Sequence, residues 1–83
     1  MTAKTNSIAT QFIATAAECL RIGRPQIEAM VECRENLVRR FGFEPNAAAN
    51  MTRLIFAAAA EQVGLSSPYT AAEIDTIAAK AAA

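Results

Sequence analysis

Three breaks, each a glycine followed within four residues by a proline, divide the 83-residue sequence into four segments. Glycine accepts the left-handed conformation in which many helices end, and proline is well tolerated in the first turn of the next helix. Between the breaks, apolar residues recur with helical spacing, and no stretch alternates with the period of a strand. The breaks are Gly23-Arg24-Pro25, Gly42-Phe43-Glu44-Pro45 and the stretch from Gly64 to Pro68. The pattern predicts an all-α fold, a compact bundle of four helices at about 8–22, 25–41, 45–63 and 71–82.

The start of the last helix carries the most specific local signal. Thr70 and Glu73 have the spacing of a capping box, in which each side chain bonds the other residue's backbone N–H. Tyr69 and Ile74 have the spacing of a hydrophobic staple around the same cap. Both signals place the first helical residue at Ala71. We expect one domain over 1–83, with frayed ends at 1–6 and 79–83.

Composition limits how much area these helices can bury. The chain is 53% apolar, but 20 of its residues are alanine, whose methyl group buries little area at roughly 25 cal/mol per Å². A single domain of this size therefore has a thin core. The formal net charge is zero, which removes the repulsion that keeps copies of a small domain apart. Both observations favour a homodimer.

The predicted helix at 45–63 is apolar on more than one side. Met51 and Ile55 lie on one face of a helical wheel, whereas Phe56 and Val63 lie on a second face. Such a helix is either central in the fold or covered by another chain, and the sequence leaves both alternatives open. For the second alternative we predict an interface built on Phe56 and Val63, flanked by two aromatic residues at the second break, Phe41 and Phe43.

Arg34 is the second unusual feature. It lies seven residues from both Ile27 and Phe41, near the middle of the apolar stripe of the helix at 25–41. A buried guanidinium without a partner is costly, so Arg34 is either a buried or interface charge with a paired carboxylate, or its stem packs while its head reaches water. The candidate carboxylates are those of Glu18, Glu61 and a second subunit.

Several kinds of chemistry have no residues to support them. The chain has no histidine, so the commonest general base and metal ligand is missing. In an antiparallel hairpin Cys19 and Cys33 are offset by roughly 7 Å along the helix axes, which disfavours a disulfide. We expect two small, buried, reduced thiols in a reducing compartment. We therefore predict no enzyme activity, no catalytic residue, no cofactor and no metal.

These features favour a non-catalytic protein–protein interaction module, such as a small adaptor or a phage-type inhibitor of another protein. The partners we expect are a second copy of the chain and an unidentified protein, without a membrane, and the localisation we expect is cytoplasmic. The alternative is a helix-turn-helix-like DNA-binding regulator that uses the helix at 45–63. That helix offers a single cation, Arg53, and the basic residues at 21–40 are offset by nearby acids, so the pattern disfavours nucleic acid. A bundle that binds an apolar ligand is a third hypothesis.

Overall fold

The computed structural model describes residues 8–64 and 71–82, and no strand occurs within these two ranges. Every predicted helix is confirmed, with boundaries within one residue of those expected. The four helices are α1 (Ile8–Arg21), α2 (Gln26–Phe41), α3 (Pro45–Gln62) and α4 (Ala71–Ala82).

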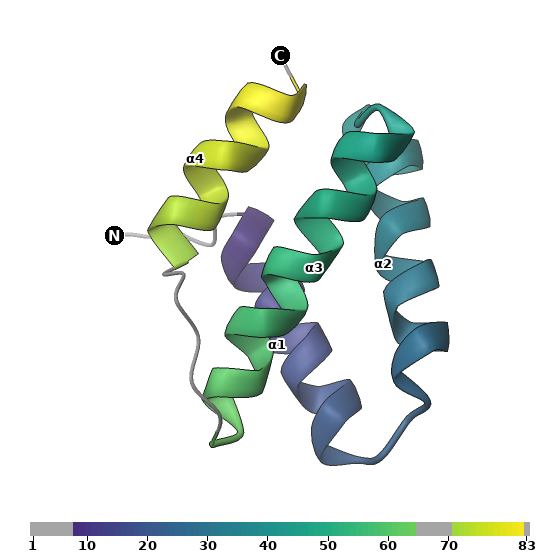
Figure 1. Ribbon diagram of the computed structural model, residues 1–83, viewed down its shortest axis with the longest axis vertical. Coiled ribbons are helices and arrows are strands. Elements are labelled where there is room, and N and C mark those ends of the chain that lie inside the picture. The colour runs from purple at the N-terminus through teal and green to yellow at the C-terminus, as the bar shows by residue number, and fades with distance from the viewer. Residues whose placement is uncertain (1–7, 65–70, 83) are drawn as a thin grey trace.

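Helix α3 is the centre of the bundle. It packs against α1, α2 and α4, and α1 also contacts α2 and α4. In Figure 1, α2 and α4 lie on opposite sides of α3, and α1 passes behind it. The Cα radius of gyration is 12.0 Å, close to the value of about 12 Å expected for a compact chain of this length. Within a single copy, three helices therefore pack against the central one.

The second break ends one helix and starts the next. Gly42 has φ 75° and ends α2 in the left-handed conformation. The carbonyl of Leu37 accepts hydrogen bonds from the N–H groups of Gly42 and Phe43, the latter at 3.1 Å. The carboxylate of Glu44 then accepts hydrogen bonds from the N–H groups of Asn46 (3.0 Å) and Ala47 (3.1 Å) at the start of α3. This carboxylate satisfies two N–H groups that a helix start otherwise leaves unpaired.

Each of the other two breaks also has a glycine with positive φ after the end of a helix. Gly23 has φ 80° after α1, and the N–H of Arg24 donates to the carbonyl of Cys19 at 3.0 Å. Gly64 has φ 115° after α3. Helix α4 begins at Ala71 as predicted, while the Thr70 cap and the Tyr69 staple lie outside the described residues.

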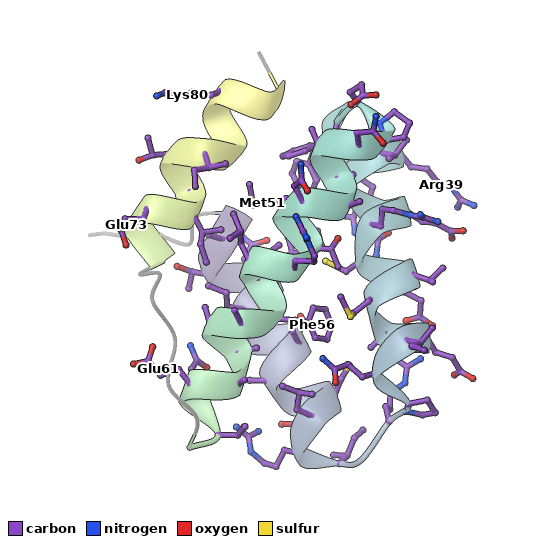
Figure 2. The ribbon with its side chains drawn as sticks, in the orientation of Figure 1. Arg39, Met51, Phe56, Glu61, Glu73 and Lys80 are labelled. Carbon is purple, nitrogen blue, oxygen red and sulfur yellow. The ribbon has the colours of Figure 1, made fainter. Side chains whose placement is uncertain are left out.

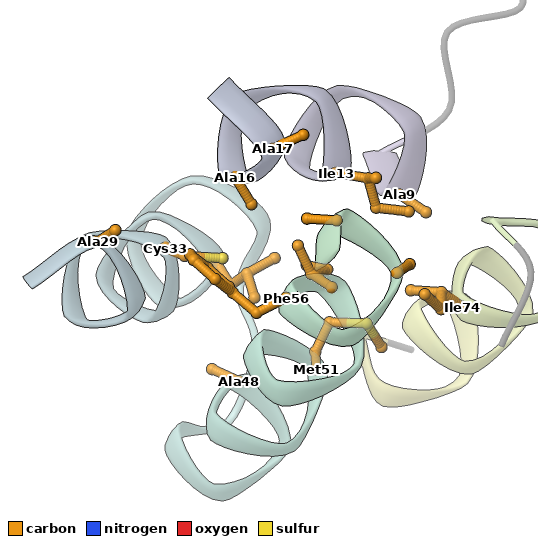
Figure 3. Close-up of a cluster of buried hydrophobic side chains, with 14 of the residues drawn as sticks. Ala9, Ile13, Ala16, Ala17, Ala29, Cys33, Ala48, Met51, Phe56 and Ile74 are labelled. Carbon is orange, nitrogen blue, oxygen red and sulfur yellow. The ribbon is translucent and has the colours of Figure 1, made fainter. Parts of the chain in front are cut away.

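The core lies on both faces of α3. Figure 3 shows Met51 extending toward Ile74 of α4, and Phe56 extending toward Cys33 of α2. Many of the surrounding residues are alanines, which allow neighbouring helices to approach closely. The large side chains that are fully buried are those of Ile13, Leu37, Met51, Ile55 and Ile74.

The structure corrects the expected placement of two aromatic residues. Phe56 is 4% exposed and Phe43 is 2% exposed, so neither side chain lies on the surface. The expectation of Phe56 on an uncovered second face of α3 is wrong, because α1 and α2 of the same chain cover that face. Of the two alternatives for this helix, the central position within one chain is the one observed.

Candidate functional site

The remaining predicted interface residues do not form one surface patch. The ring of Phe41 packs edge-to-face on that of Phe12 in α1, with centroids 5.8 Å apart, and Phe41 is half-buried by its own chain. Val63 is 38% exposed and lies just after the last turn of α3. The four predicted residues are therefore separated into core, half-buried and exposed positions. Only Val63 is freely available to a partner.

The side chain of Arg34 is exposed, so a charge buried within its own chain is not observed. The alternative in which its head reaches water fits the single chain, and an interface charge stays a prediction. Of the expected carboxylate partners, Glu18 pairs instead with Arg21, its neighbour on α1. No ion pair of Arg34 occurs among residues 8–64 and 71–82.

Arg34 is exposed because another face of α2 turns toward the core. Its buried residues are Ala29, Cys33 and Leu37, a stripe with helical spacing. The larger residue Ile27, expected on the buried face, is 78% exposed, and Val31, one turn further along the same apolar stripe, is 40% exposed. Small side chains at the contact let α2 approach its neighbours closely, and the arginine-containing stripe is left at the surface.

This exposed stripe forms one wall of a groove between α2 and α3. The groove has a volume of about 510 Å³, and each helix contributes one wall. Its lining residues are Ile27, Met30, Val31 and Arg34 from α2, and Ala49, Asn50, Thr52 and Arg53 from α3. The groove combines apolar side chains with one arginine from each wall. Sequence patterning identified the apolar stripe of α2 but assigned it to the core.

The polar groups of the α3 wall are already hydrogen-bonded within the chain. Thr52 is buried, and its hydroxyl donates to the carbonyl of Ala48 at 2.8 Å. The Arg53 Nη2 donates to Asn50 Oδ1 at 2.6 Å. This bond holds the guanidinium beside a neutral acceptor, and no carboxylate of the described residues pairs with it. The groove therefore carries two cationic side chains and no carboxylate among its lining residues.

A polar cluster lies at the connection between α1 and α2. The Arg24 guanidinium donates to both carboxylate oxygens of Glu32, at 3.1 and 2.9 Å, and lies 3.8 Å from Cys19 Sγ. These hydrogen bonds, and the charge of Arg24, hold the pKa of Glu32 below its usual value. The hollow beneath the pair has a volume of about 70 Å³. That space suits a few water molecules rather than a ligand, so the cluster has a structural role.

The two cysteines line that same small hollow. Both are free thiols, as predicted, with Cys33 buried and Cys19 half-buried. Burial raises the pKa of the Cys33 thiol, and a hydrogen bond with Thr52 partly opposes this effect. A thiol with a raised pKa is a poor nucleophile near neutral pH.

Within the described part of the chain, no cluster of three or more acidic or thiol side chains is arranged to hold a metal ion. None of the described helices combines the length and apolar character needed to cross a bilayer. Comparison of the chain with protein-family models, with curated proteins and with solved structures finds no significant match.

Proposed function

We propose that this chain is a non-catalytic protein–protein interaction module whose docking surface is the groove between α2 and α3. The observation that carries the proposal is that Ile27 and Val31 are exposed beside Met30 in this groove. Isolated apolar side chains are ordinary on protein surfaces, but apolar residues gathered in a groove are typical of binding sites. The three residues share one face of α2, so a partner can contact all of them at once.

The shape of the groove favours a protein over a small ligand. Small-molecule pockets bury most of the surface of their ligand. Ile27 lines this groove and is 78% exposed. The groove is therefore too open at this point to bury most of the surface of a small ligand. A groove between two helices with apolar residues at helical spacing is instead suited to a docked helix.

The test compares two isoleucines that lie close together in sequence. Ile22, after the end of α1, is 62% exposed and lies outside the groove, whereas Ile27 lines it. The immobilised wild-type chain and the Ile22→Asp variant should retain the same proteins from an extract of the source cells. The Ile27→Asp variant should lose them, since a charge in the groove opposes apolar docking. Identical retention by all three, with unchanged circular dichroism, contradicts the proposal.

The predicted alternative of DNA binding gains no supporting observation. A recognition helix needs free side chains that reach base edges. Thr52 of α3 is buried, and Arg53 is hydrogen-bonded to Asn50. The helix itself lies at the centre of the bundle. DNA binding stays an untested prediction, and salt-dependent retention on immobilised DNA would support it.

The predicted homodimer also stays a prediction. It was expected to cover a second apolar face of α3, and α1 and α2 of the same chain already cover that face. The zero net charge still favours self-association. Light scattering distinguishes a monomer of 8.8 kDa from a particle of twice that mass.

A further inference from the structure

We propose that the partner of the α2–α3 groove is an acidic amphipathic helix, with apolar side chains on Ile27, Met30 and Val31 and a carboxylate between Arg34 and Arg53. This inference rests on the proposed function and specifies the chemistry of the partner. It is carried by the charges of the groove and by the spacing of its residues.

The groove is positively charged on both walls. Arg34 projects from α2 and has no ion pair among the described residues, while Arg53 on α3 is bonded to the neutral Asn50. A carboxylate between two guanidinium groups forms charge-assisted hydrogen bonds that are stronger than neutral ones. A partner that buries these arginines must supply that negative charge, because buried unpaired charges are costly.

Acidic residues elsewhere on α2 do not neutralise the groove. Glu32 and Glu28 both lie near Arg24, at 2.9 and 4.0 Å, and neither lines the groove. Glu35 lines an adjoining hollow together with two arginines, Arg34 and Arg39. Figure 2 shows Arg39 extending outward at this end of α2. The local charge at the arginine end of the groove therefore stays positive.

The spacing of the lining residues sets the pattern expected in the partner. Ile27 and Arg34 are seven residues apart on α2, which corresponds to about 10 Å along the helix axis. A helix lying along the groove covers this distance in about two turns. We therefore expect apolar anchors at i, i+3 and i+4 with a carboxylate at i+7. For the opposite direction we expect the reversed order, with the carboxylate at i and the anchors at i+3, i+4 and i+7.

The probes for the test are fluorescein-labelled synthetic helical peptides of about four turns. The acidic probe has leucines at i, i+3 and i+4 and glutamate at i+7 in an alanine and glutamine background. A second probe has lysine in place of the glutamate, and both are also made with the reversed sequence. Fluorescence anisotropy should show that the wild-type chain binds one acidic probe at least about tenfold more tightly than its lysine counterpart.

The arginine variants decide whether the groove produces this preference. Arg34→Glu should reverse it, so that the lysine probe binds more tightly than the acidic probe, and Arg53→Glu should weaken it. Arg40→Glu is the matched control, since Arg40 is exposed on the same helix but lines a different hollow beside α1. It should leave the preference unchanged. Equal binding of both probes by the wild-type chain, or an unchanged preference in Arg34→Glu, overturns the inference.

Two further measurements test two other occupants of the groove, a small amphiphile and a second copy of the chain. Displacement of the acidic probe by dodecanoate at the affinity of the probe itself would assign the groove to a small amphiphile and overturn the inference. A particle of twice the monomer mass that dissociates in Ile27→Asp would assign it to a second copy, with the same consequence. If capture of proteins depends on Ile27 but the probes show no charge preference, the proposed function stands and this inference fails.

Discussion

The guanidinium of Arg24 donates hydrogen bonds to both carboxylate oxygens of Glu32, across the corner between α1 and α2. Arg24 belongs to the break itself, and Glu32 lies in the second turn of α2. Arg24 also lies 3.8 Å from Cys19 Sγ near the end of α1. One side chain in the connection therefore contacts both helices that it joins.

We expect the Glu32→Gln variant to be less stable than wild type near neutral pH, but not in acid. The pKa of Glu32 is lower in the folded chain than in the unfolded one, mainly because Arg24 donates hydrogen bonds to the carboxylate. Its stabilising contribution is therefore present above the unfolded pKa and is lost as the pH falls through the folded pKa. Thermal unfolding measured from about pH 7 down to about pH 3 should show a small difference that shrinks as the pH falls through the folded pKa.

Salt provides the control for this pair. Both side chains are partly exposed to solvent, so the contribution to stability is small and screened by ions. The difference between wild type and Glu32→Gln should shrink in high salt at neutral pH. A difference that stays constant across pH and salt would contradict an electrostatic origin.

Phe56→Ala should be strongly destabilising. Phe56 is 4% exposed in the core, and removal of a buried aromatic ring typically costs about 3–5 kcal/mol. Val63→Ala, at a position 38% exposed, should change the free energy of unfolding by less than about 1 kcal/mol. Urea denaturation followed by circular dichroism measures both. Similar small effects at the two positions would mean that Phe56 is not a core residue.

The two cysteines should differ in reactivity. Cys33 is buried and its thiol has a raised pKa, whereas Cys19 is half-buried. A thiol-specific disulfide reagent at mildly alkaline pH should modify Cys19 first, because the thiolate is the reacting form. In the Cys19→Ser variant, where Cys33 is the remaining thiol, modification should be slow in the folded chain and faster in denaturant. Equally fast labelling of the Cys19→Ser and Cys33→Ser variants would contradict the burial of Cys33.

Gly42→Ala should be destabilising through backbone conformation alone. Gly42 has φ 75°, and a Cβ added there meets no atom within 4 Å. The left-handed conformation costs an L-residue about 1–2 kcal/mol, and Gly42→Asn should cost less because asparagine tolerates this conformation better. Urea denaturation should rank the three chains in the order glycine, asparagine, alanine. Equal stability of all three would indicate that the end of α2 rearranges.

Helix boundaries could be predicted well because their signals are local. Gly42 and Pro45 limit the backbone conformations available at the second break, whatever surrounds them. The start of α3 was placed correctly from Pro45, although the Glu44 carboxylate that caps it was not anticipated. Glutamate is not among the residues most favoured at this position, so the pattern carried no clear signal.

The groove could not be predicted because its residues are the ones that sequence patterning assigns to a core. Ile27, Met30 and Val31 form an apolar stripe, and such a stripe normally faces inward. The structure instead turns inward a face with Ala29, Cys33 and Leu37, and Met30 is partly buried against the core. Packing of α2 against its neighbours decides between the two stripes, and that choice depends on contacts between residues far apart in the chain.

The sequence by itself determined the four helices, their order and the absence of histidine chemistry, because glycine, proline and helical periodicity act within a few residues. Only the tertiary structure decided that Phe56 lies inside the bundle and that Arg34 lines an open groove. Periodicity specifies which residues share a face of a helix. The neighbouring helices determine whether that face is covered, since burial depends on what packs against it.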